Sequence, residues 1–161
     1  MDSTSLRHAY DALLDAAAAV AGARDPGPPP PSGQWTAEQI LAHVAIVGAA
    51  TIVAVSSVAS GSPATYDNRN AQDAWTLERV IERAGGNAGL RERIGRQGDA
   101  LCALAPALSD AELDTLVPTL LLSNGTALVD QPLPLRDILT GLADVELPGH
   151  AAQLLATRTG V

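Results

Sequence analysis

Between Ile40 and Gly61 the chain carries no Asp, Glu, Lys or Arg. An uncharged apolar segment of this length either crosses a membrane or forms a helix buried at the centre of a helical protein. His43 and several Ser and Thr residues interrupt the segment, much of it is alanine, and no basic residue closely flanks either end. The charge asymmetry that orients a membrane span is therefore missing. These features favour a buried central helix, and we expect no membrane association.

The core must be built from small and aliphatic side chains, because aromatic residues make up 2% of the chain and Phe is absent. Alanine is the best helix former, and it dominates the regions 12–23, 42–59 and 99–107. The 161 residues suit one domain, 1–161, with a sizeable apolar core. Composition thus favours an all-α fold.

Four helical patterns are visible, over about 5–23, 36–59, 76–108 and 135–158. A proline-rich linker, 24–34, separates the first two, and Thr36 with Gln39 forms a capping-box pattern at the second. Glycines in the third region either break it near Gly85 or let another helix pack closely. We predict an up-down four-helix bundle.

The region 117–134 differs from the rest of the chain. Two apolar runs flank Asn124 and Gly125, which is a strong signal for a two-residue hairpin turn. We expect a small hairpin or an extended excursion there, but not a sheet.

Charge and cysteine content exclude several classes of protein. The formal net charge of −8 argues against nucleic acid as a partner, because a polyanion requires clustered basic residues. The single Cys102 cannot form an intramolecular disulfide and lies in an apolar stretch typical of a buried thiol. The N-terminal region lacks the pattern of a secretory signal, so a cytoplasmic protein is expected.

Two of the three histidines lie where a metal site would need them. Glu146 and His150 are four residues apart, a spacing that places both side chains on one helix face. His43 lies in the uncharged second helix and is expected to point into the bundle. Three such ligands leave coordination positions open, as in catalytic sites. The alternatives are a hydrogen-bonded core histidine at position 43 and a simple surface pair at 146 and 150.

Two segments resemble the DinB/YfiT-like superfamily of metalloenzymes. GQWTAEQILAHVAIV resembles its second-helix signature, in which a Trp and a capped helix start precede a metal-binding His. ADVELPGHAAQLLA resembles a later motif with a ligand, a His four residues on, and then Gln. Glu at the first of these positions is similar to the branch of mycothiol-dependent maleylpyruvate isomerases, whose metal is held by His, Glu and His.

The resemblance implies a DinB/YfiT-like bundle in which His43, Glu146 and His150 bind one divalent metal. Zinc is the expected ion, with nickel, iron or manganese as alternatives. It also implies a homodimer acting on a small molecule, with Gln153 near the metal and Arg69 as a candidate in the substrate pocket. The implied function is S-transfer or isomerisation of a small electrophile with a low-molecular-weight thiol such as mycothiol. The alternative is a non-catalytic, dimeric DinB-like protein that binds a metal or ligand.

Pro148 and Gly149 lie between two of the proposed ligands. Proline inside a helix removes one backbone hydrogen bond and clashes with the preceding turn. Either the helix bends there, or a new helical segment starts at Pro148 and Glu146 points away from the metal.

Overall fold

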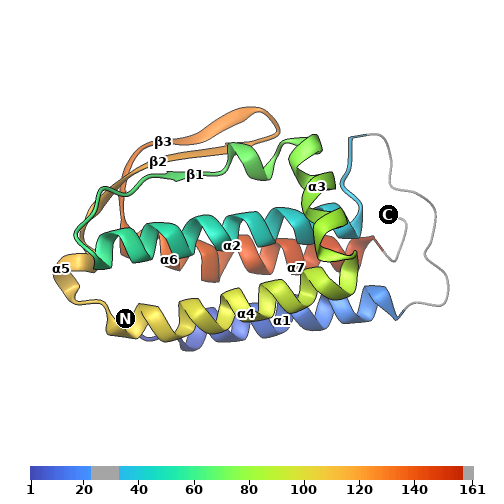
Figure 1. Cartoon of the computed structure of the whole chain (residues 1–161), viewed down its shortest axis with the longest axis horizontal. Coiled ribbons are helices and arrows are strands. Elements are labelled where there is room, and N and C mark those ends of the chain that lie inside the picture. Colours follow the sequence, from blue (N-terminus) through green and yellow to red (C-terminus); the bar gives the residue numbers. More distant parts are fainter. Residues whose placement is uncertain (23–32, 158–161) are drawn as a thin grey trace.

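Figure 1 shows the chain as a computed structural model, which describes residues 1–22 and 33–157. The expected proline-rich linker, 24–34, lies outside the described residues up to position 32. On either side of it are the first two long helices, α1 (Thr4–Ala21) and α2 (Ala37–Ala59). The capping box predicted at the start of α2 is present, with the Thr36 side chain accepting from the Gln39 backbone and Gln39 bonding back.

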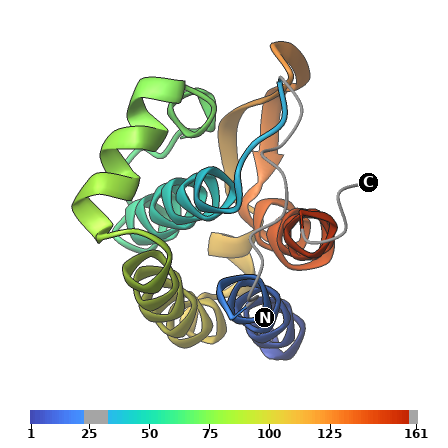
Figure 2. The same ribbon diagram turned by 90° about the vertical axis from the view of Figure 1, so that its right-hand side faces the viewer.

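Four long helical segments pack side by side (Figure 2). They are α1, α2, α4 (Asn87–Leu104) and a C-terminal segment made of α6 (Leu135–Gly141), a π-helical turn (Leu142–Glu146) and α7 (Leu147–Ala156). Both α1 and α2 contact α4 and α7. The seam between α2 and the C-terminal segment is where the candidate site lies.

The order of helix directions differs from the prediction. Along the bundle, α2 and α4 run in the same direction (Figure 1). The chain returns between them through a strand, β1 (Tyr66–Asp67), a 3-10 turn (Arg69–Ala71) and the helix α3 (Ala74–Ala84). The strict up-down order was therefore wrong, because this connection crosses back along the bundle before α4 begins.

The all-α class was also wrong, because a three-stranded mixed sheet covers one side of the bundle. Strands β2 (Leu116–Ser123) and β3 (Thr126–Pro134) form an antiparallel hairpin. Its turn lies at Asn124 and Gly125, which both have positive φ angles, of 49° and 75°. The edge of β2 that faces away from β3 has backbone groups free to pair with another strand. Strand β1 pairs with this edge in parallel, with Tyr66 opposite Thr119. The expected hairpin thus belongs to a sheet.

The third helical region is both broken and closely packed. Gly85 and Gly86 have φ angles of 78° and 79°, a left-handed conformation that ends α3 before α4 starts. Within α4, a Cβ atom at Gly98 would lie 2.8 Å from Cγ of Tyr10 on α1. Gly98 therefore permits the close approach of α1 and α4. After α4, a 3-10 turn (Ala105–Ala107) and a short helix, α5 (Asp110–Leu113), lead into β2.

The apolar helix α2 has more than half of its residues buried. By length and composition it could cross a membrane, but 61% of its most apolar stretch is buried inside the structure. Ile40, Leu41 and Val55 are completely buried. The protein itself therefore covers much of the apolar surface of this helix.

Candidate metal centre

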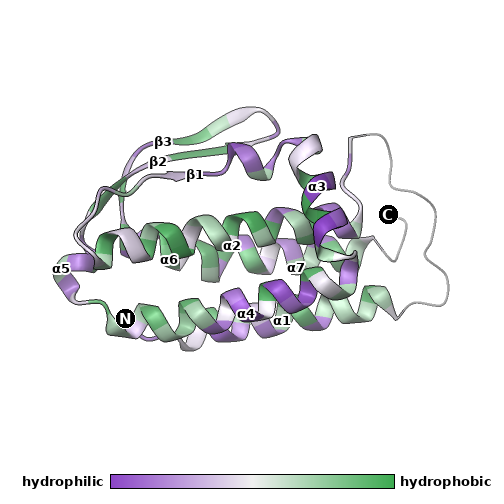
Figure 3. Ribbon diagram, viewed as in Figure 1, coloured by the Kyte–Doolittle hydropathy of each residue, from purple (hydrophilic) through white to green (hydrophobic). Residues whose placement is uncertain are grey.

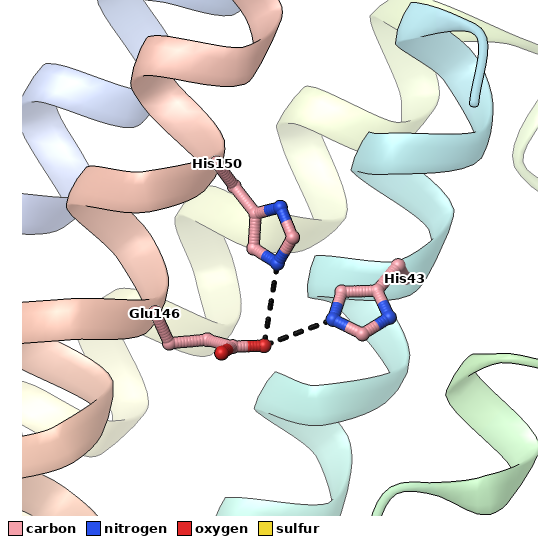
Figure 4. Close-up of side chains that lie close together, drawn as sticks. All are labelled: His43, Glu146 and His150. Carbon is pink, nitrogen blue, oxygen red and sulfur yellow. Dashed lines mark hydrogen bonds and ion pairs between the residues drawn. The ribbon is translucent and has the colours of Figure 1, made fainter. Parts of the chain in front are cut away.

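His43, Glu146 and His150 come together from two packed helical segments. His43 lies two turns into α2, on the side that faces the C-terminal segment, and its side chain is 3% exposed. Glu146 ends the π-helical turn, and His150 follows one turn later in α7. Figure 4 shows the three side chains pointing toward one another across the seam.

The distances within this cluster are short. Nε2 of His43 lies 2.9 Å from Oε1 of Glu146, and Nε2 of His150 lies 3.3 Å from the same oxygen. One ligand atom from each residue lies within 4.8 Å of the other two, so the group could hold a metal ion.

The π-helical turn accounts for the position of Glu146 ahead of Pro148. The helix does not end at the proline but continues from Leu135 to Ala156, with Leu142–Glu146 in the wider π form. Pro148 occupies the first turn of α7, and the change of hydrogen-bond register over the preceding turn accommodates its missing N–H. Glu146 consequently stays on the same face as His150. Of the two possibilities left open by the sequence, the structure has Glu146 facing His43.

The Nδ1 atoms of His43 and His150, which point away from Glu146, determine how the two imidazole rings are oriented. Nδ1 of His43 lies 2.8 Å from the carbonyl oxygen of Ala71, which can only accept, so this nitrogen carries a proton. Nδ1 of His150 donates in the same way to Oε1 of Gln153, at 2.9 Å. In the neutral form of each ring, Nε2 therefore presents a lone pair to the Glu146 carboxylate. Two lone pairs and a carboxylate oxygen converge on one point, an arrangement that a cation stabilises.

The pKa values of the cluster reflect this convergence. Burial raises the pKa of Glu146. Hydrogen bonds and charge interactions with His150 and His43 lower this pKa by a larger amount, so the net pKa lies far below its usual range. Burial lowers the pKa of His150, yet the hydrogen bond and negative charge of Glu146, with a contribution from Gln153, raise it overall. Glu146 is thus an anion at neutral pH, and where no cation is bound a proton on His150 faces it.

A cavity of about 910 Å³ opens above the cluster, between the helices and the hairpin. Trp35, just before α2, stands at its edge with its ring 4.8 Å from that of His43 and 6.5 Å from that of His150. The apolar stretches of β2 and β3 lie across from α2 (Figure 3). The cavity volume is within the range of small-molecule sites, and the histidines and Glu146 form part of its lining.

The other two predicted site residues have different positions. Gln153 lines the cavity and holds His150 through the hydrogen bond described above. The structure does not bring Arg69 to the cavity, because its guanidinium is exposed and paired with Asp67. Trp35, the Trp of the superfamily signature, directly precedes the Thr36 cap of α2 and lines the cavity.

Sequence reasoning missed two cavity residues, Asn68 and Gln72, which follow β1. Both side chains donate to the carbonyl oxygen of Leu122 on β2, and the amide N–H of Leu122 donates to Oδ1 of Asn68 at 2.8 Å. They fix the hairpin above the cluster. No local pattern marks them, because they act on a residue fifty or more positions away in the sequence.

Comparison of the chain with known protein families, with curated proteins and with solved structures found no match.

Proposed function

We propose that this protein is a DinB/YfiT-like metal-dependent enzyme, in which His43, Glu146 and His150 hold one zinc ion and a low-molecular-weight thiol reacts at it. The observation that carries the proposal is the convergence of three ligand atoms within 4.8 Å at the base of a cavity. The sequence resemblance supplies the reaction class, S-transfer or isomerisation of a small electrophile.

The donor set fits a catalytic rather than a structural metal. Two imidazole nitrogens and one carboxylate oxygen suit zinc, and also nickel, iron and manganese. Three protein ligands leave at least one coordination position for a thiol or water. The Ala71 carbonyl and Gln153 hold the outer nitrogens, so both rings are fixed in the orientation that ligation requires.

A thiol cofactor agrees with the absence of a cysteine among the described cavity residues. The single cysteine, Cys102, is buried in α4 and does not line the cavity. A free thiol has a pKa near 8.5, and a bound divalent cation lowers it so that the thiolate predominates at neutral pH. The described residues around the metal would orient the thiol and keep bulk water away. Trp35 is placed for this role, because its ring lies beside both imidazoles.

Turnover that needs both metal and thiol would test the proposal. Zinc-loaded protein would be assayed with mycothiol and chlorodinitrobenzene, with cysteine as a second thiol, and turnover measured against substrate concentration. We expect saturable turnover that disappears without either metal or thiol. In His43→Ala the rate should fall at least about 100-fold, as expected when a metal ligand is lost.

His8→Ala is the matched control, because His8 is exposed on α1 and belongs neither to the ligand group nor to the cavity lining. Its rate should equal that of the wild type. Stoichiometric metal without thiol-dependent turnover of any electrophile tested would support the alternative, a non-catalytic metal-binding protein.

A further inference from the structure

Two walls of the cavity above the cluster carry aliphatic side chains. The hairpin contributes Leu121, Leu128 and Leu133, and the C-terminal segment contributes Ile138, Leu142 and Val145. Leu128 and Val145 are largely exposed, at 68% and 70%, although each is a large apolar side chain. Apolar side chains left open to solvent at the mouth of a concave site are typical of a surface that binds an apolar ligand.

The charged groups of the cavity are all acidic or imidazole. Asp137 and Glu146 line it, and no arginine does so among the described residues. The chain has ten arginines and no lysine. Arg69, which follows β1 closely in the sequence, is paired with Asp67. A ligand carboxylate would therefore enter a space lined by two carboxylates, with no arginine among the described lining residues and with His150 already facing Glu146. Burial of an unpaired anion beside like charges is strongly unfavourable.

Three of the amide side chains that line the cavity are engaged with the protein itself, whereas Gln34, Ser123 and Asn124 also line it. Asn68 and Gln72 bond the backbone of Leu122, and Gln153 bonds His150. No described basic side chain of the cavity offers a charged donor to an anion, whereas the aliphatic side chains and the ring of Trp35 offer contact to an uncharged body.

We propose that the cavity takes an uncharged substrate with an apolar body and rejects carboxylates. This inference rests on the proposed function, since it names the substrate class of the same site. The reacting end of the substrate lies at the His43–Glu146–His150 cluster, and its apolar body lies against the hairpin wall. The lack of a described cationic clamp separates this cavity from one built for a dicarboxylate.

A matched pair of ligands tests the charge preference: methyl cinnamate and the cinnamate anion, which share one aromatic body. Binding would be followed by Trp35 fluorescence in a Trp75→Phe background, since Trp75 is exposed on α3 and outside the cavity. Titrations on chelator-treated protein remove any coordination of the carboxylate by metal, and circular dichroism verifies the fold. We expect the ester to bind at least about tenfold more tightly than the anion.

Leu128→Arg should reverse this preference, because it places a cation on the aliphatic wall. Leu116→Arg is the matched control: Leu116 is 63% exposed on the neighbouring strand and does not line the cavity. We expect the control to keep the preference for the ester. Arg24 and Arg158 lie outside the described residues, and the double variant Arg24→Ala/Arg158→Ala should also keep it.

Equal or tighter binding of the anion to the wild type would overturn the inference, as would a lack of ester binding up to its solubility limit. Metal content, measured on the same preparations, separates the two proposals. Protein that takes up zinc but binds the anion as well as the ester refutes only the charge preference. Protein that takes up no metal but prefers the ester refutes the metal centre and leaves the charge preference standing.

Discussion

Two faces of α2 bury polar groups in different ways. On the face toward the C-terminal segment, Nδ1 of His43 donates to the carbonyl oxygen of Ala71, and Nε2 lies 2.9 Å from Oε1 of Glu146. On the face toward α4 and α1, Gln97 donates to the carbonyl oxygen of Ala45 at 2.9 Å. There, however, Oε1 of Gln97 and the hydroxyl of Tyr10 are buried without a hydrogen-bond partner among the described residues.

The contrast shows that burial of polar atoms does not by itself mark a site. A buried group without a partner reduces stability, and the Tyr10 hydroxyl is carried into the core by a ring that packs on Gly98. At the His43 face, each imidazole is oriented by a partner outside the cluster, and the free lone pairs point to one place. Ligand atoms that are oriented toward one point distinguish a candidate metal centre from polar atoms that are merely buried in the core.

Removal of the shared carboxylate should have the largest effect. Glu146→Ala should weaken zinc binding at least about 100-fold, because it removes a ligand and the negative charge that balances the cation. Asp144→Ala is the control, since Asp144 is exposed on the same π-helical turn. Competition with a chromophoric chelator measures both. Equal affinities in the two variants would erase the proposed difference between the faces of α2.

Alkaline pH should destabilise the protein through its buried hydroxyl groups. Burial raises the pKa of the Tyr66 hydroxyl to about 12. It also raises the pKa values of the Tyr10 hydroxyl and of the Cys102 thiol. A folded-state pKa above the unfolded value contributes stability that is complete below the unfolded pKa, near 10 for Tyr, and is lost as pH rises to the folded pKa. For Tyr66 the loss by pH 12 is about 2–3 kcal/mol.

Denaturant unfolding between pH 9 and pH 12, about the range of tyrosine ionisation, measures this loss. The chain has no lysine to titrate in the same interval. Tyrosinate absorbance should appear together with the loss of helical dichroism. Its appearance in a protein that is still folded would contradict the burial of these hydroxyl groups.

A methyl group at Gly98 should damage the α1–α4 contact. The added Cβ of Gly98→Ala would meet the base of the Tyr10 ring at 2.8 Å, and we expect a loss of about 1–3 kcal/mol in unfolding free energy. Gly95→Ala in the same helix meets only Leu14, at 3.7 Å, and should gain up to about 1 kcal/mol from helix propensity. Chemical denaturation compares them, and equal values would contradict the close packing.

Gln153 should have a smaller effect on metal affinity than a ligand. Gln153→Ala removes the partner of Nδ1 of His150, and zinc binding should weaken about tenfold, as for other residues that orient metal-bound histidines. The exposed Gln131 on β3 provides the control variant Gln131→Ala. Isothermal titration with zinc would measure both. An unchanged affinity in Gln153→Ala would mean that His150 needs no such orientation.

The smallest predicted effect is a gain in stability. Tyr10→Phe removes the hydroxyl without a partner and should raise the unfolding free energy by about 1 kcal/mol. Tyr66→Phe removes a hydroxyl that lies 3.2 Å from Oγ1 of Thr51 and should lower it by a similar amount. Opposite signs in urea denaturation would sharpen the comparison, whereas a loss in Tyr10→Phe would show that this hydroxyl has a partner.

Local patterns in the sequence predicted the parts of the fold that local chemistry determines. The cap at Thr36, the break at Gly85 and the turn at Asn124 all act through neighbouring residues. The parallel pairing of β1 with β2 involves two residues of β1 and no local signal, so the sheet was not predicted. The shared direction of α2 and α4 depends on the same long connection.

For the candidate site, spacing and resemblance selected His43, Glu146 and His150, which the structure brings together. The π-helical turn that keeps Glu146 in place is a backbone adjustment without a sequence signature at this proline. Arg69 was selected as the best candidate for the substrate pocket, whereas its ion pair with the half-buried Asp67 determines where it points. The homodimer, the cytoplasmic location and the thiol cofactor stay predictions.

Metal content by elemental analysis tests the central claim most directly, on protein purified without an affinity tag or chelator. We predict about one divalent ion per chain in the wild type and in His8→Ala, and none in folded His43→Ala or His150→Ala. A folded wild type that carries no metal and takes up none from zinc, nickel, iron or manganese would contradict the account. The cluster would then be a hydrogen-bonded feature of the core.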